Sequence, residues 1–233
     1  MTRMTDPFPS RGEASAAVAD SGWRFLDNKL FAASVPVRSL VQGVAVVQAA
    51  AEACGPDADD HLRADVRADR VELVLQTRER NRVTPRDAEL AKEITAALRN
   101  HGMNIAPPTG VARPVQDLEI AIDALDIPKI RPFWLAVLGY QDDPAERGDA
   151  AGAIADPANQ LPTFWFQQMD EPREQRNRIH FDITVAHDEA ERRLQAALDA
   201  GGTLVTDEHA KSFWVLADAE GNEICICTWQ DRD

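Results

Sequence analysis

The residues best suited to chemistry stand in the carboxyl-terminal half, where a histidine belongs to a segment with the pattern of a β-strand. His180 lies in RIHFDITVA, residues 178–186, and its imidazole could bind a divalent cation or exchange a proton. Arg173, Arg176 and Arg178 precede it. A guanidinium forms paired hydrogen bonds to carboxylate or phosphate, so Arg178 could orient an anionic substrate; a solvated run between two modules is the alternative.

A second group of reactive side chains lies near the carboxyl terminus. Cys225 and Cys227 belong to EICIC, residues 223–227, and with Cys54 they make three cysteines, an odd number that argues against a disulfide framework. A thiolate at Cys225 would suit zinc, but cysteine is also common in protein cores, which is the interpretation that we favour for both. Glu223 stands two residues before Cys225, so in a strand it could share that face.

The elements that must position these residues repeat one pattern twice. Glycine follows both predicted helices, at Gly139 and at Gly201-Gly202, as it commonly does at helix ends. Each repeat has the order βαβββ, and an internal duplication of this kind predicts a curved sheet around a pocket. The segments that carry the pattern are strands at 117–125, 161–169, 178–186, 203–208, 212–218 and 223–229, with helices at 127–140 and 187–202.

The amino-terminal half shows a different order, β-β-α-β-β-α. Two hairpins are predicted around Asp27-Asn28 and around residues 68–70, because these residue types favour tight turns. Apolar residues at helical spacing predict a helix that starts after Pro36 and ends at Gly55-Pro56. Thr84, followed by proline and an early acid, predicts the start of the last helix. A short helix at 12–20 could precede these elements.

Composition and charge limit the classes of partner. The segment 104–116 holds three prolines and one glycine and reads as a linker between domains at 1–103 and 117–233. The first domain has 14 Lys and Arg against 15 Asp and Glu, whereas the rest has 11 against 24, within a whole-chain net charge of −14. An acidic surface repels nucleic acid and anionic membranes, so we expect neither as a partner. The basic run at 78–82 reads as a solvated loop. Without a membrane-length apolar run or a signal peptide, we expect a cytoplasmic protein.

The amino-terminal half resembles the pterin-4a-carbinolamine dehydratases. The motifs that carry this resemblance are GWRF at 22–25, Pro56-Asp57 after the long helix, and LVLQTRERNRVTPRDAELAKEI at 73–94. In that family three histidines handle the protons of a dehydration. The matching positions here hold Cys54-Gly55 and Arg78, and we interpret His61 as a surface histidine in a strand. The resemblance therefore implies a domain that has lost dehydratase activity but keeps the family's tendency to form dimers.

The carboxyl-terminal half resembles the glyoxalase-like branch of the vicinal-oxygen-chelate superfamily. The segments that match in order are FWLAVLGY at 133–140, NRIHFDI at 177–183, ALDAGGTLV at 197–205 and DAEGNEICIC at 218–227. The fold class expected for the whole chain is α+β, with a ββαββα dehydratase-like domain and a paired βαβββ glyoxalase-like domain. Members of the superfamily include lyases, isomerases and metal-free binding proteins, so the fold leaves the activity open.

The glyoxalase-like resemblance also implies candidate metal ligands. It places the first ligand at Glu119 and the third at His180, which could hold a divalent metal such as Zn, Ni, Mn or Fe. The fourth position falls on Cys225, with Glu223 as a nearby carboxylate. The second lies within 161–169, where only Gln167 or Gln168 offers an oxygen. Alternation places Glu119 opposite the apolar residues of its strand, a pattern that fits a pocket and a solvated face equally well.

Aromatic residues complete the predicted pocket. Phe164, Trp165 and Trp214 are the candidates for substrate-binding walls, although alternation must turn about half of the aromatic side chains toward the helices. The leading hypothesis is a small-molecule enzyme, a lyase or isomerase of the glyoxalase type, with Glu119, His180 and Glu223 as its catalytic residues. The alternatives are a protein that binds or sequesters a small molecule without turnover, and an assembly protein; a homodimer is expected in each case.

Overall fold

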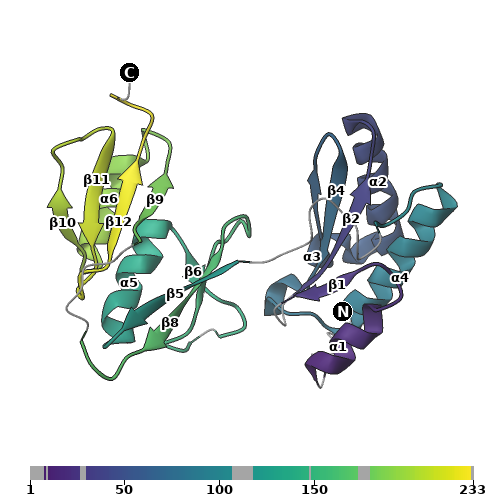
Figure 1. Cartoon of the computed structure of the whole chain (residues 1–233), viewed down its shortest axis with the longest axis horizontal. Coiled ribbons are helices and arrows are strands. Elements are labelled where there is room, and N and C mark those ends of the chain that lie inside the picture. Colours follow the sequence, from purple (N-terminus) through teal and green to yellow (C-terminus); the bar gives the residue numbers. More distant parts are fainter. Residues whose placement is uncertain are drawn as a thin grey trace. The chain divides into compact units, whose positions relative to one another are not determined.

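The chain forms two compact units (Figure 1). Each unit has a hydrophobic core of its own. The structure is a computed structural model that describes residues 8, 10–26, 30–106, 118–146, 148–172 and 179–231. The first unit spans Met1–Asp117 and the second Leu118–Asp233. Both combine helices with sheets, which confirms the expected α+β class. No described helix has the length and apolar character needed to cross a bilayer.

The predicted linker lies mostly outside the described residues. Its first three residues, 104–106, are described, and they pack against the first unit. Ala106 donates its backbone N–H to the carbonyl of Ser34 at 2.7 Å, and Ile105 contacts the first core.

The first unit packs helices against one antiparallel sheet whose strand order is β1-β2-β4-β3. The predicted strand pairings of both hairpins are confirmed, with Leu26 opposite Leu30 and Val66 opposite Val71. The elements of this unit are α1 (Arg11–Val18), β1 (Arg24–Leu26), β2 (Leu30–Pro36), α2 (Leu40–Cys54), η1 (Gly55–Asp57), α3 (Ala58–His61), β3 (Leu62–Val66), β4 (Arg70–Leu75), η2 (Arg78–Arg80) and α4 (Pro85–Asn100).

Helix caps determine where the two long helices of this unit begin. The Ser39 side chain accepts a hydrogen bond from the Gln42 backbone, so α2 starts at Leu40 rather than directly after Pro36. Helix α4 begins as predicted, with Thr84 as its N-cap and Asp87 completing a reciprocal capping box.

The core of the first unit follows from the alternation in β4. Val71, Leu73 and Leu75 are fully buried, while the residues between them are only half-buried. Trp23 is also fully buried, and its indole N–H donates to the Thr95 hydroxyl of α4 at 3.1 Å. Burying a large apolar side chain contributes about 1.5–3 kcal/mol, so this layer dominates the stability of the unit.

The second unit consists of two βαβββ modules, as predicted. The strand orders are β5-β8-β7-β6 and β10-β11-β12-β9, with parallel pairs β5–β8 and β12–β9. The first module contains β5 (Glu119–Ala124), α5 (Ile127–Leu138), β6 (Gln141–Asp142), β7 (Ile154–Ala155) and β8 (Thr163–Gln168). The second contains β9 (Phe181–Thr184), α6 (Ala190–Asp199), β10 (Thr203–Thr206), β11 (Phe213–Ala217) and β12 (Glu223–Cys227).

Both modules contribute to one core. Trp134 of α5 stacks on Phe164 of β8 and meets the edge of Phe181 of β9. The Trp134 indole N–H donates at 3.0 Å to the buried Asp218 carboxylate in the turn before β12. Glu220 in the same turn accepts hydrogen bonds from two backbone N–H groups, those of Leu125 and Asp126, at the start of α5. This turn therefore ties the second module to the first.

Three short elements were not predicted from the sequence. Strands β6 and β7 have two residues each, too few to show alternation. Helix α3 is a single turn that follows the end of α2 at Gly55, whose φ is 56°.

Candidate functional site

Strand alternation gives the second module a core face and an opposite, open face. Phe181 and Ile183 of β9 contact the core, so Asp182 between them lies on the open face and is exposed. In the parallel pair β12–β9, Cys225 lies opposite Asp182, and partners in register share a face of the sheet. His180 directly precedes β9, two residues before Asp182, and is also exposed. The register thus brings three potential ligands together.

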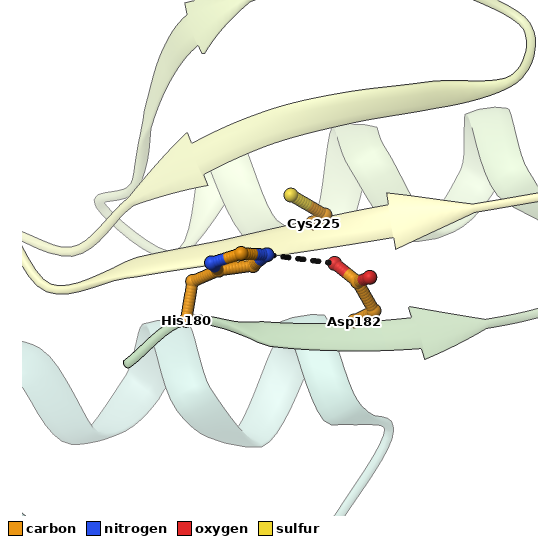
Figure 2. A group of neighbouring side chains, drawn as sticks. All are labelled: His180, Asp182 and Cys225. Carbon is orange, nitrogen blue, oxygen red and sulfur yellow. Dashed lines mark ion pairs between the residues drawn. The ribbon is translucent and has the colours of Figure 1, made fainter. Parts of the chain in front are cut away.

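These three side chains form a compact group (Figure 2). One ligand atom from each of His180, Asp182 and Cys225 lies within 4.8 Å of the other two. The Nε2 atom of His180 is 3.6 Å from Oδ1 of Asp182. Bonds of about 2.0–2.3 Å to a tetrahedral zinc place ligand atoms roughly 3.3–3.8 Å apart, so this spacing fits a metal. An imidazole, a carboxylate and a thiol together match the preferences of Zn²⁺ and similar divalent ions.

The surroundings keep the thiol of Cys225 protonated at neutral pH. Burial raises its pKa from 9.0 to about 12, and a hydrogen bond to Asp182 adds to the rise. Cys225 is buried, whereas His180 and Asp182 are exposed, so a cation could approach from the solvent side. A bound divalent cation stabilises the thiolate and displaces its proton, which is the usual coupling between metal binding and thiol ionisation.

Some of the ligands predicted from the sequence belong to the group of His180, Asp182 and Cys225, and others lie elsewhere. His180 and Cys225 belong to it. Cys225 is also buried, in agreement with its interpretation as a core cysteine. Glu119 opens β5 in the other module and is not a member. Glu223 opens β12, two residues before Cys225, and is also outside the group.

The glutamines expected to offer a second ligand do not join the group. Gln167 is exposed at the end of β8. Gln168 donates its side-chain amide to the carbonyls of Leu125 and Met169 at 2.9 and 3.0 Å.

The aromatic residues lie on both faces. Phe164 and Trp214 are buried and belong to the core shared by the modules, so the structure corrects their assignment as pocket walls. They occupy the alternate strand positions that face the helices. Trp165 is 38% exposed and stands on the opposite face of β8. Arg173, Arg176 and Arg178 lie outside the described residues.

Asp182 is the member of the group that sequence reasoning missed. It stands in the quoted motif NRIHFDI, two residues after His180. The i and i+2 spacing in a strand was the available signal, because it places both side chains on one face. Only the register with β12 shows that this face also carries Cys225.

Comparisons with protein families match each unit to one family. Residues 119–227 match the family model of the glyoxalase-like domain, and residues 9–97 match that of pterin 4 alpha carbinolamine dehydratase. The chain joins a dehydratase-type domain to a glyoxalase-like domain. Both expected resemblances are thereby confirmed. A comparison with curated proteins found no match.

Solved structures resemble the chain over about half its length. A glyoxalase/bleomycin resistance protein/dioxygenase family enzyme from Burkholderia phytofirmans PsJN is 17% identical, with 47% of this chain and 95% of that protein covered and a TM-score of 0.35. The fosfomycin resistance protein FosX from Listeria monocytogenes is 11% identical, with 49% and 93% covered and a TM-score of 0.38. A hypothetical protein from S. aureus is 16% identical, with 49% and 97% covered and a TM-score of 0.38.

The dehydratase-type domain holds a histidine paired with a buried carboxylate, which corrects the interpretation of His61 as a surface residue in a strand. His61 ends α3, and its side chain is only 13% exposed. Its Nδ1 donates to Oδ1 of the fully buried Asp87 at 2.8 Å. The other carboxylate oxygen accepts from the hydroxyls of Thr77 and Thr84 and from the Thr84 backbone.

This arrangement can hold a proton. The hydrogen bond to Asp87 raises the pKa of His61 above its ordinary value of 6.5 and outweighs the opposing effect of burial. No hydrogen bond of the Nε2 atom occurs within the described part of the chain, so the ring has one nitrogen anchored and one available.

Proposed function

We propose that the glyoxalase-like domain is a metal-assisted lyase or isomerase that acts on a small molecule with neighbouring oxygen atoms. The observation that carries this proposal is the group of His180, Asp182 and Cys225 on the open face of the β9–β12 pair. Its ligand types, its spacing and its access to solvent all suit a divalent cation.

Each residue near the group has a distinct role in this proposal. His180, Asp182 and Cys225 hold the metal, which supplies a Lewis acid that stabilises negative charge on a substrate oxygen. Glu223, on the same strand as Cys225, takes and returns a proton. Glu119 is a second candidate for this step, and Trp165 offers an exposed ring for an apolar part of the substrate. Arg178 is the candidate for binding an anionic group.

Cobalt titration tests the metal site without knowledge of the substrate. Addition of Co²⁺ to the full-length protein should produce the absorption band of cobalt–thiolate charge transfer, because Cys225 would bind through sulfur. His180→Ala should weaken binding at least tenfold, and Cys225→Ser should abolish the band.

Two substitutions serve as matched controls for this titration. His187→Ala removes another exposed histidine, and Cys227→Ser removes the cysteine two residues away, so both should leave the band in place. A protein that binds no divalent metal, or one whose band survives Cys225→Ser, would show that the proposal is wrong.

Binding without turnover is the second candidate function. This function is supported because all three potential ligands belong to one module, whereas Glu119 of the other module is not a member of the group. It is also supported by the exposed ring of Trp165. Thermal-shift screening of metals and small metabolites separates the two functions. Stabilisation by a metabolite that persists with chelator favours binding alone, whereas stabilisation that needs the metal favours the enzyme.

For the dehydratase-type domain we propose loss of the dehydration activity. The positions matched to three family histidines hold Cys54, Gly55 and Arg78, which leaves His61 as the imidazole paired with a buried carboxylate in the described part of this unit. An assay of carbinolamine dehydration with wild type and His61→Ala tests this directly. Activity above the uncatalysed rate that disappears in His61→Ala would overturn the proposal.

A further inference from the structure

Strand β11 carries apolar side chains on both of its faces. Trp214 and Leu216 are buried on the core face and share a core with residues of α5 and α6. Phe213 and Val215 alternate with them, so they lie on the open face of the sheet. Both are half-buried, and among the described residues neither is part of that core. The open face of β11 thus carries apolar surface that the packing of the helices does not explain.

The strand register joins this apolar surface to the candidate metal site. Val215 lies opposite Cys225 in the antiparallel pair β11–β12, and Asp182 lies opposite Cys225 in the parallel pair β12–β9. One row across the open face is therefore Asp182, Cys225 and Val215. The next row is made in the same way by Thr184, Cys227 and Phe213. Polar side chains of β9 thus stand on one side of β12, and apolar side chains of β11 stand on the other.

Strand geometry gives the dimensions of the apolar surface. Neighbouring strands lie about 4.8 Å apart, so Val215 is one such spacing from Cys225. Phe213 and Val215 are about 7 Å apart along the strand, because each residue adds about 3.4 Å. An oxygen bound to a metal lies about 2 Å from it, so carbon atoms next to that oxygen would already reach β11. The surface therefore has the size of one aromatic ring or of a short branched alkyl group.

The extent and charge of this surface favour a small molecule as its occupant. A stable protein interface buries about 800 Å² on each partner, several times the area that one phenylalanine and one valine side chain can provide. No charged residue stands between Phe213 and Ala217, and the acidic character of this half of the chain disfavours an anion beside them. The occupant is therefore apolar and uncharged where it contacts β11.

We propose that Phe213 and Val215 bind the apolar body of the substrate while the metal group binds its neighbouring oxygens. This inference rests on the metal-assisted function proposed above, and it names the substrate class. The substrate is a compound whose two oxygens lie directly beside an uncharged aromatic or branched alkyl group. The apolar body is thereby assigned to the sheet that carries the metal group rather than to Trp165 of the other module.

Two hydroxamates test this substrate class without knowledge of the natural substrate. Acetohydroxamate and benzohydroxamate both chelate a metal through two neighbouring oxygens, but one carries a methyl group and the other a phenyl ring. Calorimetric titration of the cobalt-loaded, full-length protein should show that benzohydroxamate binds roughly tenfold more tightly or better, because β11 removes the ring from water. Equal affinities would overturn the inference and leave the metal site standing. A protein that binds no cobalt would overturn the proposed function, and this inference with it.

An isosteric substitution tests the role of Val215. Val215→Thr keeps the branched shape but replaces a methyl group with a hydroxyl, so the preference for benzohydroxamate should fall about fourfold, the effect of one buried carbon group. The affinity for acetohydroxamate should stay within about twofold. Val66→Thr is the matched control on β3 of the first unit, where Val66 is 36% exposed, and it should change neither affinity. A preference that is undiminished in Val215→Thr contradicts the proposal.

Nuclear Overhauser effects locate the ring directly. In the zinc-loaded protein with labelled methyl groups, the ring protons of benzohydroxamate should show contacts with the methyl groups of Val215. Contacts with the ring of Trp165 in their place would assign the apolar body to the other module and overturn the inference, whatever the affinities are.

Discussion

At the scale of single residues, the candidate metal site depends on three side chains with different environments. Cys225 is buried and has a raised pKa, whereas His180 and Asp182 are exposed and can reorient toward a cation. The carboxylate of Asp182 lies close to both of the others, so it can share the metal with them. The open face thus supplies one rigid ligand and two adjustable ones.

Asp182→Ala should weaken cobalt binding by about a hundredfold while the cobalt–thiolate band remains at saturation, because the sulfur ligand is still present. The measurement is a titration followed by absorption. Asp188→Ala removes another exposed carboxylate near α6 and should change the affinity less than twofold. Equal affinities for wild type and Asp182→Ala would exclude Asp182 as a ligand.

His61 should make stability depend on pH. Its pKa in the folded state is raised by Asp87 above the ordinary value of 6.5, so the protonated pair stabilises the fold fully below that value. The contribution is lost as the pH rises through the higher folded pKa. The difference in unfolding free energy between wild type and His61→Gln should therefore be larger at about pH 5.5 than at about pH 9. Urea unfolding at both values measures it, and a difference that grows with pH would contradict the assignment.

At the scale of elements, the two modules of the glyoxalase-like domain depend on close contact between α5 and the turn after α6. A Cβ added at Gly202 would overlap the ring of Phe133, which is fully buried in α5. Arg193 of α6 lies against Gly139 and donates to the carbonyl of Val137, at the end of α5. The glycines predicted as helix ends thus also serve the packing between modules.

Gly202→Ala should destabilise the glyoxalase-like domain by about 2 kcal/mol, since a methyl group forced into a packed core displaces its neighbours. Gly12→Ala is the matched control in α1, where the nearest atom to an added Cβ is Ser10 Oγ at 3.9 Å. That variant should be neutral or slightly stabilising. Chemical unfolding monitored by fluorescence compares them, and equal midpoints would show that the contact with Phe133 relaxes freely.

At the scale of the whole molecule, the chain combines two units with separate cores and different charge. The dehydratase-type half is close to neutral, whereas most of the net charge of −14 belongs to the glyoxalase-like half. The buried apolar side chains of the first unit form one core and those of the second unit form another, so each unit has its own source of stability.

Separate cores predict two unfolding transitions in calorimetry of the full-length chain. Leu73→Ala in the first core should lower the midpoint temperature of one transition, and Ile130→Ala in the second core should lower that of the other. Each substitution should reduce the unfolding free energy of its own unit by about 2–5 kcal/mol. The two variants control for each other. A single transition lowered equally by both would show that the units unfold as one.

The sequence by itself determined the element order and the residue types available for chemistry. Caps and turns act locally, so Thr84, Gly55 and the strand pairings of the two hairpins could be predicted without a structure, and so could the duplicated βαβββ pattern. Alternation also separated the two faces of each strand, but it could not say which face a helix covers.

Only the tertiary structure decided which side chains meet. Phe164 and Trp214 face the helices. His61 pairs with Asp87, which stands too far along the chain for helical or strand periodicity to predict the contact. Asp182 and Cys225 came together through the register of two parallel strands joined by a helix and two further strands. Register between strands so far apart is set by the packing of the whole module, which is why the candidate site could not be assembled from the sequence.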